Sequence, residues 1–98
     1  MWISLVEVTG PRDNPILEGS PGAFTHYLTL AKNARQHGSD ARRAAKALGL
    51  TVKKALWCER LEHRLERCEI EDYLKDLALR VSRSGVGSFG KFHVWASE

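Results

Sequence analysis

The sequence predicts an α+β domain of the ferredoxin-like two-layer type, with a four-stranded antiparallel sheet and two helices on one face. Three observations support this class. An alternating, β-rich segment opens the chain at residues 2–8, and another closes it at residues 88–96. Between them, residues 69–84 repeat apolar side chains at helical spacing. The expected order of elements is strand, strand, helix, strand, helix, strand.

Length and composition set the class of protein. Ninety-eight residues predict a single domain over 1–98, and 43% hydrophobic with 28% charged residues is typical of a folded chain. The apolar start carries Glu7 and lacks a basic lead, and no later run approaches about 20 apolar residues. We therefore expect a cytoplasmic protein without a membrane partner, whose two cysteines remain thiols.

The first strand and the loop after it come next in the chain. Residues 2–8 carry apolar side chains on both faces, which favours an interior strand over an exposed edge. Residues 9–22 hold all three prolines and three of the eight glycines, so they predict a long loop, and loops of this length are often functional. We expect Ile16 and Leu17 to hold this loop against the body.

A strand and a helix are expected over residues 23–48. Residues 23–31 fit either a helix or a strand, and alternation with threonine and aromatic residues favours the strand. A helix then ends at Leu48 and begins at Asn33 or Ser39, because both residues are good N-caps. Gly49 suits a left-handed C-terminal cap. The residues expected to face the core from this helix are Ala41, Ala44, Ala45 and Leu48.

Residues 50–59 admit two interpretations with different functional consequences. As a helix capped by Thr51 after Gly49, they would form a helix-turn-helix in a mostly helical domain with terminal strands. That helix would lack large aliphatic anchors at Ala55 and Cys58 and would expose few side chains suited to contact base edges. As a strand, which we favour, they place Trp57 on one face, and a short helix follows. The inward positions of this strand are Leu50, Val52, Leu56 and Cys58, and those of the short helix are Leu61, Leu65 and Cys68.

The last third of the chain contains the clearest element. A helix over residues 69–84 has acidic residues at its start, basic residues at its end and Gly85 as its stop. Its apolar face consists of Ile70, Leu74, Leu77 and Val81. Gly85, Gly87 and Gly90 spell G-x-G-x-x-G, but they follow a helix and open a strand. A dinucleotide-binding fold requires the reverse order, so we interpret the motif as a turn.

Catalytic and metal sites find little support in the residues. Cys58, His63 and Cys68 spell C-x4-H-x4-C, yet on one helix these positions point to different faces, and a fourth ligand is not evident. The four histidines are scattered, and no serine or cysteine lies in a recognisable nucleophile motif. We expect neither a cofactor nor a metal, and no enzymatic activity.

Charge is distributed unevenly along the chain. Residues 32–67 hold ten basic and four acidic residues, a net charge of +6, while the remainder carries −3. Such polarisation predicts a surface that binds another macromolecule. A protein partner is the first expectation, with the chain acting as an inhibitor, an immunity protein or an adaptor. A nucleic-acid-binding regulator that uses the basic 32–67 segment is the alternative. The expected contact residues are Arg12, Asp13, Ile16, Leu17, Arg42, Arg43, Lys46, Lys53 and Lys54.

Overall fold

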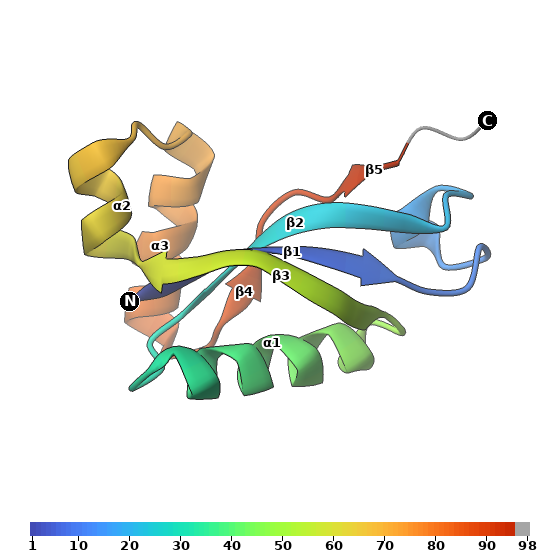
Figure 1. The fold of residues 1–98 in the computed structure, drawn as a ribbon, viewed down its shortest axis with the longest axis horizontal. Coiled ribbons are helices and arrows are strands. Elements are labelled where there is room, and N and C mark those ends of the chain that lie inside the picture. Colours follow the sequence, from blue (N-terminus) through green and yellow to red (C-terminus); the bar gives the residue numbers. More distant parts are fainter. Residues whose placement is uncertain (96–98) are drawn as a thin grey trace.

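The structure is a computed structural model that describes residues 1–95, and its helices and strands form an α+β fold (Figure 1). The strands are β1 (Trp2–Thr9), β2 (Gly22–Thr29), β3 (Thr51–Arg60), β4 (Ser88–Phe89) and β5 (His93–Val94). The helices are the 3-10 turn η1 (Pro15–Leu17), α1 (Ala34–Ala47), α2 (Leu61–Arg67) and α3 (Asp72–Ser84). The predicted α+β class and the general order of elements are confirmed.

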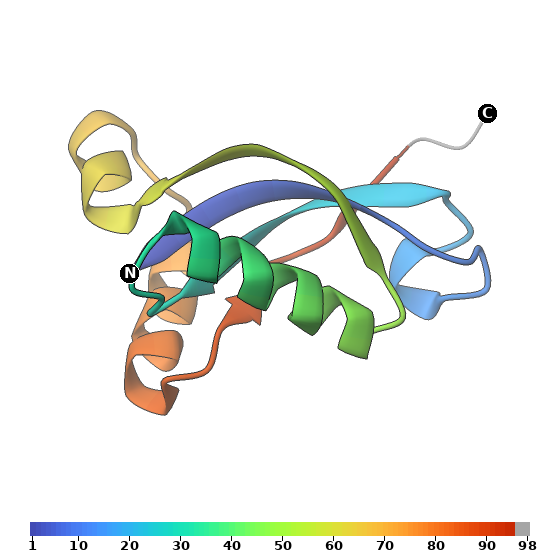
Figure 2. The same ribbon diagram turned by 60° about the horizontal axis from the view of Figure 1, so that its bottom comes forward.

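The sheet is antiparallel and has the order β3-β1-β2-β4, with β5 also pairing with β2. The interior position predicted for β1 is confirmed, because β1 pairs along its whole length with β2 on one side and β3 on the other. A ferredoxin-like sandwich is not confirmed. The sheet has five strands rather than four, and α1 and α3 cover opposite faces of it (Figures 1 and 2).

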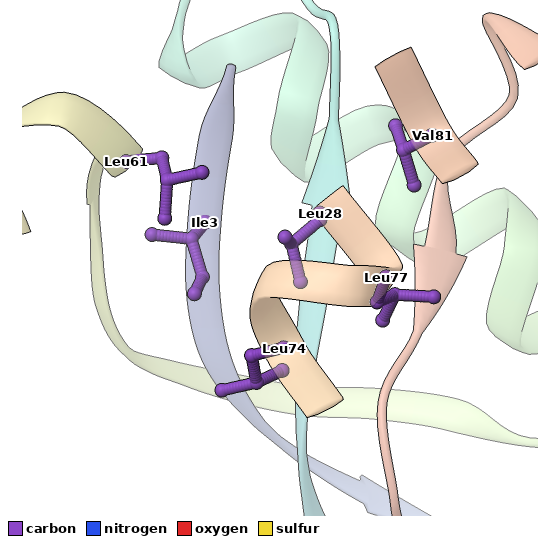
Figure 3. Packing of buried hydrophobic residues seen from close by; sticks show 6 residues of the cluster. All are labelled: Ile3, Leu28, Leu61, Leu74, Leu77 and Val81. Carbon is purple, nitrogen blue, oxygen red and sulfur yellow. The ribbon is translucent and has the colours of Figure 1, made fainter. Parts of the chain in front are cut away.

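The helices lie on both faces because β1 and β2 are apolar on both. Ile3 and Leu28 are paired neighbours that point toward α3, where they pack with Leu74, Leu77 and Val81 (Figure 3). Leu61 at the start of α2 completes this cluster. On the other face, a second cluster beneath α1 consists of Val6, Val8, Leu17, Ala23, Ala45 and Leu50. Burying these side chains contributes roughly 1.5–3 kcal/mol for each large aliphatic residue.

The loop between β1 and β2 packs against the body, as predicted. Leu17 is fully buried, and Ile16 packs against the same cluster. Asn14 caps η1 by accepting a hydrogen bond from the Ile16 amide at 3.0 Å, and its side-chain amide donates to the Leu48 carbonyl oxygen at 2.8 Å. The tip of the loop therefore lies beside the end of α1.

The helix-turn-helix alternative is wrong, because residues 51–60 form a strand that pairs with β1. Gly49 adopts a φ of 77° and ends α1, and the β-branched pair of Thr51 and Val52 then enters the sheet. The preferred strand is confirmed, but two of its predicted inward positions are wrong. The register shift between Leu5 and Val6 leaves Leu56 without a partner on β1, and its side chain is exposed. Cys58 pairs with Ser4 and lines the α1 side of the strand, but at the edge of the sheet it is also exposed.

The two helices that flank β3 correct the predicted boundaries and faces. Helix α1 begins after Asn33, whose side chain accepts a hydrogen bond from the Gln36 amide at 2.9 Å. Ala41 and Ala45 are buried as expected, whereas Leu48 is exposed because it follows the last helical turn. In α2 only Leu61 is buried. Leu65 and Cys68 are exposed, because Leu61 and Arg64, which covers the Trp57 ring, form the side of this short helix that contacts the body.

The predicted final strand over residues 88–96 is broken into β4 and β5, and Ala96 lies outside the described residues. Gly85 ends α3 with a φ of 73°, as predicted. Gly87 passes so close to Tyr27 and Thr29 that a side chain there would collide with both. These glycines thus have structural roles, consistent with a turn. Among the helices of residues 1–95, none has both the length and the apolar character needed to cross a bilayer.

Candidate functional site

A groove between α1 and β3 is the main concave feature beside the edge of the sheet. Helix α1 runs lengthwise beneath β1 and β3 (Figure 2), and the groove between them has a volume of about 360 Å³. The side chains of its walls are small and largely apolar. α1 contributes alanine and glycine, and larger residues at these positions would fill the groove. The lining residues are Ser4, Val6, Ala34, His37, Gly38, Ala41, Arg42, Val52, Lys53, Lys54, Ala55 and Cys58.

The floor of the groove contains a buried histidine whose two ring nitrogens are both hydrogen-bonded. His37 Nε2 lies 2.8 Å from Ser4 Oγ on β1, and His37 Nδ1 lies 2.8 Å from Thr29 Oγ1 on β2. All three side chains are at most 2% exposed. Thr29 Oγ1 also accepts a hydrogen bond from the Ala31 amide at 3.2 Å. The histidine therefore connects α1 to the two central strands of the sheet.

The hydrogen-bonded cluster of Ser4, Thr29 and His37, which we call the brace, has the chemistry of a structural element. Burial lowers the pKa of His37 from its ordinary 6.5 to about 4, and nearby Asp40 opposes this shift only in part. The imidazole is consequently neutral at pH 7 and a weak base, and a hydroxyl rather than a carboxylate orients it. Ser4 is 1% exposed, so an incoming carbonyl carbon cannot reach its Oγ. The Ser4–His37 pair lacks the properties of an activated nucleophile.

The outer edge of β3 borders the groove. β3 is the terminal strand of the sheet, and within residues 1–95 no strand pairs with its outer edge. Most of its side chains are exposed, including the apolar Leu56 at 46%. Its ten residues leave a row of main-chain donors and acceptors open to solvent. This edge, with the groove on its α1 side, is the candidate functional site.

The opposite side of β3 carries cations and aromatic rings. Lys54 Nζ lies 4.0 Å from Glu7 Oε1, and Lys53 Nζ lies 5.7 Å from the centre of the Trp95 ring. Glu7 alternates with Val6 and Val8, which face α1, so both amines lie on the face away from α1. Trp57 shares that face, and the Arg64 guanidinium covers its ring at 3.8 Å. Arg64 and Arg67 are both paired with Glu59, which neutralises part of this charge.

The structure distributes the predicted basic contact residues over several surfaces. Arg42 lines the groove, whereas Arg43 lies on the other flank of α1, 3.4 Å from Asp40. Lys46 is exposed on the last turn of α1. Although Lys53 and Lys54 line the groove, their amines turn away from it. Of the predicted basic residues on α1, Arg42 is the one that lines the groove.

The predicted loop residues occupy the end of the molecule beyond α1. Arg12 and Asp13 are exposed at the loop tip, near the carboxyl end of α1. Ile16 is half-buried and Leu17 is fully buried, so both pack against the core beneath the loop. Leu17 consequently has no surface to offer a partner, and we remove it from the candidate site.

Sequence reasoning missed the brace and the unpaired edge. His37, Ala41 and Ala45 recur every four residues on one face of α1, so a helix starting at Asn33 places the histidine on the buried side. That signal was present in the sequence. Its partners Ser4 and Thr29 come from separate strands, and their approach depends on the register of β1 with β2.

Cys58 and Cys68 are free and exposed, and residues 1–95 contain no cluster of three side chains able to hold a metal ion. No protein-family model, curated protein or solved structure matches the chain.

Proposed function

We propose that this chain is a small non-enzymatic protein that binds a protein partner, as an inhibitor, an immunity protein or an adaptor-type modulator. The observation that carries the proposal is the unpaired outer edge of β3. An extended segment of another protein can add to such an edge by main-chain hydrogen bonds. The ten residues of β3 exceed the five or six of an ordinary strand, and residues 57–60 are its longest stretch in unbroken register with β1.

Charge favours an acidic segment as the added strand. Arg42 on α1 and Lys53 and Lys54 on β3 flank the edge, and no acidic side chain neutralises Arg42 within residues 1–95. Lysines on an edge strand discourage it from pairing with copies of itself, because the like charges would be brought together. Bulges have the same effect, because they twist the edge out of regular geometry. The same lysines attract carboxylates, so they select an acidic partner over a second copy of this chain.

The alternative function is a nucleic-acid-binding regulator, and the net charge of +6 over residues 32–67 supports it. Residues 51–60 form a strand, so they offer no recognition helix for the major groove. Arg42, Lys46 and Lys53 would then contact phosphates, and binding would be largely independent of sequence.

Selection of phage-displayed heptapeptides on the immobilised chain tests strand addition. We expect enrichment of acidic, β-prone peptides that bind wild type and Cys58→Ala but lose at least about tenfold in affinity, or about 1.4 kcal/mol, for Cys58→Pro. The Leu61 amide donates to the Met1 carbonyl oxygen, so alternation along this unbroken register turns the Cys58 N–H away from β1, and proline at Cys58 removes a donor of the open edge while sparing the β1–β3 ladder. Circular dichroism checks that this variant is folded. Peptides that bind the proline variant equally well would overturn strand addition.

A titration with mixed-sequence duplex DNA and RNA separates the alternative function. Phosphate binding through several cations gives an affinity that falls steeply between about 50 and 200 mM salt, with a slope of about −0.9 per phosphate contact on duplex DNA. Micromolar binding with such a slope, weakened by Arg42→Glu but not by Arg83→Glu at the distant end of α3, would favour the nucleic-acid function.

A further inference from the structure

We propose that the partner segment alternates apolar and acidic side chains, with the apolar ones facing α1 and the acidic ones facing away from it. This inference rests on strand addition at β3, the proposed function, and specifies the sequence class of the partner. It follows from the different chemistry of the two sides of the same edge.

The first step is the geometry of an added strand. Successive side chains of a strand point to opposite faces, so every second side chain of the partner would lie on the α1 side of the sheet. There it would meet the groove beside Val52 and Ala55. The groove volume of about 360 Å³ is at the small end of the range for ligand pockets, about 300–1,000 Å³. It suits individual aliphatic side chains.

The second step is the polarity of that groove. Val6, Ala41 and Val52 form apolar walls, and His37 in the floor is neutral with both nitrogens already hydrogen-bonded. A carboxylate inserted among these groups would lose its water without gaining a hydrogen-bond donor from the floor, which is costly. Arg42 is exposed at the α1 rim of the groove, so it can pair with a carboxylate of the partner at that rim but not among the apolar walls. An aliphatic side chain instead gains from burial there.

The third step concerns the opposite side of β3. The amines of Lys53 and Lys54 lie on this face, and within residues 1–95 the only carboxylate paired with either is Glu7, at the limiting distance of 4.0 Å from Lys54. Both amines lean toward β1 and Trp95, but the Lys54 side chain is 63% exposed, so its amine can turn to the outer edge and pair with an acidic side chain of an added strand that remains partly in water. Such pairs contribute modestly, about 0.2–1 kcal/mol each, but they fix which face of the peptide turns toward α1.

The experiment compares two acetylated, amidated heptapeptides of equal composition. EVELEVE places its three aliphatic residues on one face of a strand, whereas EEVLVEE divides them between both faces. The isotope-labelled protein is titrated with each peptide, and changes in the NMR chemical shifts of the amides of residues 51–60 report binding at β3. We expect the alternating peptide to bind at least about tenfold more tightly, and KVKLKVK to bind more weakly than both.

Substitutions in the groove test whether it causes the preference for the alternating peptide. Ala55 is exposed at the rim, so Ala55→Phe should fill the groove without disturbing the core, leaving weak binding with no preference between the two acidic peptides. Ala47→Phe makes the same change on the other flank of α1 and should keep the preference.

The outcomes separate the inference from the proposed function. If both acidic peptides shift the β3 amides with equal affinity, strand addition stands and the alternating pattern is wrong. If neither peptide shifts them, the proposed function itself fails. A preference that survives Ala55→Phe would also overturn the groove as its cause.

Discussion

His37 is the residue on which the packing of α1 depends most directly. It joins the helix to β1 through Ser4 and to β2 through Thr29, and its ring is 1% exposed. Any substitution leaves at least one buried hydroxyl without its partner, and an unsatisfied buried polar group costs about 1–3 kcal/mol. We therefore expect that loss of these two hydrogen bonds loosens the contact of α1 with the sheet beside the groove.

The brace predicts a characteristic dependence of stability on pH. The pKa of His37 is about 4 when folded and near 6.5 when unfolded, so only the unfolded chain gains a proton between these values. The contribution of the neutral His37 to the free energy of unfolding is complete above pH 6.5. It is lost as the pH falls toward 4, by up to about 3 kcal/mol. His37→Gln should be less stable than wild type at pH 7, with a difference that shrinks toward pH 4.5.

Urea unfolding of both proteins at pH 7, 5.5 and 4.5 measures this difference. His63 is exposed on α2, and His63→Gln serves as the control, with an expected change within about 0.5 kcal/mol at every pH. If the difference in unfolding free energy between wild type and His37→Gln stayed constant from pH 7 to 4.5, a neutral, buried imidazole would be contradicted.

Two glycines predict opposite responses to the same change. Gly38 lies inside α1, and the nearest atom to an added methyl group is Arg42 Nη1 at 3.6 Å, so Gly38→Ala should stabilise the protein by about 1 kcal/mol. Gly87 lies against Tyr27 and Thr29, and Gly87→Ala should destabilise it by about 1–3 kcal/mol. Thermal melts of both variants decide the signs, and two shifts in the same direction would contradict these local environments.

At the scale of the element, sequence reasoning succeeded where one periodicity operates without interruption. β1 and α3 have regular apolar patterns, and their buried residues Ile3, Leu74 and Leu77 were placed by sequence alone or by simple packing. β3 was assigned as a strand, but its two register shifts put Leu56 on the exposed side, and no residue type in the sequence marks a bulge there.

The candidate site was less predictable than the elements that build it. The sequence indicated a basic surface, but whether Arg42 and Arg43 share one flank of α1 depends on how the helix is rotated against the sheet. The buried Ala41 and Ala45 set that rotation and place the two arginines on opposite flanks. That β3 ends the sheet follows from strand order, which local patterns do not encode.

At the scale of the whole molecule, one sheet supports two separate cores. Val81 belongs to the cluster beneath α3 and Val6 to the cluster beneath α1, and the clusters share no buried residue. Val81→Ala and Val6→Ala should each cost about 1–3 kcal/mol, and their effects should add within about 0.5 kcal/mol.

Denaturant unfolding of the single and double variants tests this additivity. Ile3→Val combined with Val81→Ala is the comparison pair, since both residues lie in one cluster and their effects should depart from additivity. Strong coupling between Val6 and Val81 would show that the sheet transmits packing changes from one face to the other.

The central place of β1 also bears on the order in which the molecule assembles. This strand leaves the ribosome before both of its partners, and β2, its neighbour on one side, is complete at Thr29. Its neighbour on the other side, β3, is complete only at Arg60. During synthesis a β1–β2 hairpin can therefore form while the other edge of β1 is still unpaired. In that interval the unpaired edge can aggregate with other nascent chains. When β3 pairs with β1 it closes that side and becomes, in turn, a long unpaired border of the sheet.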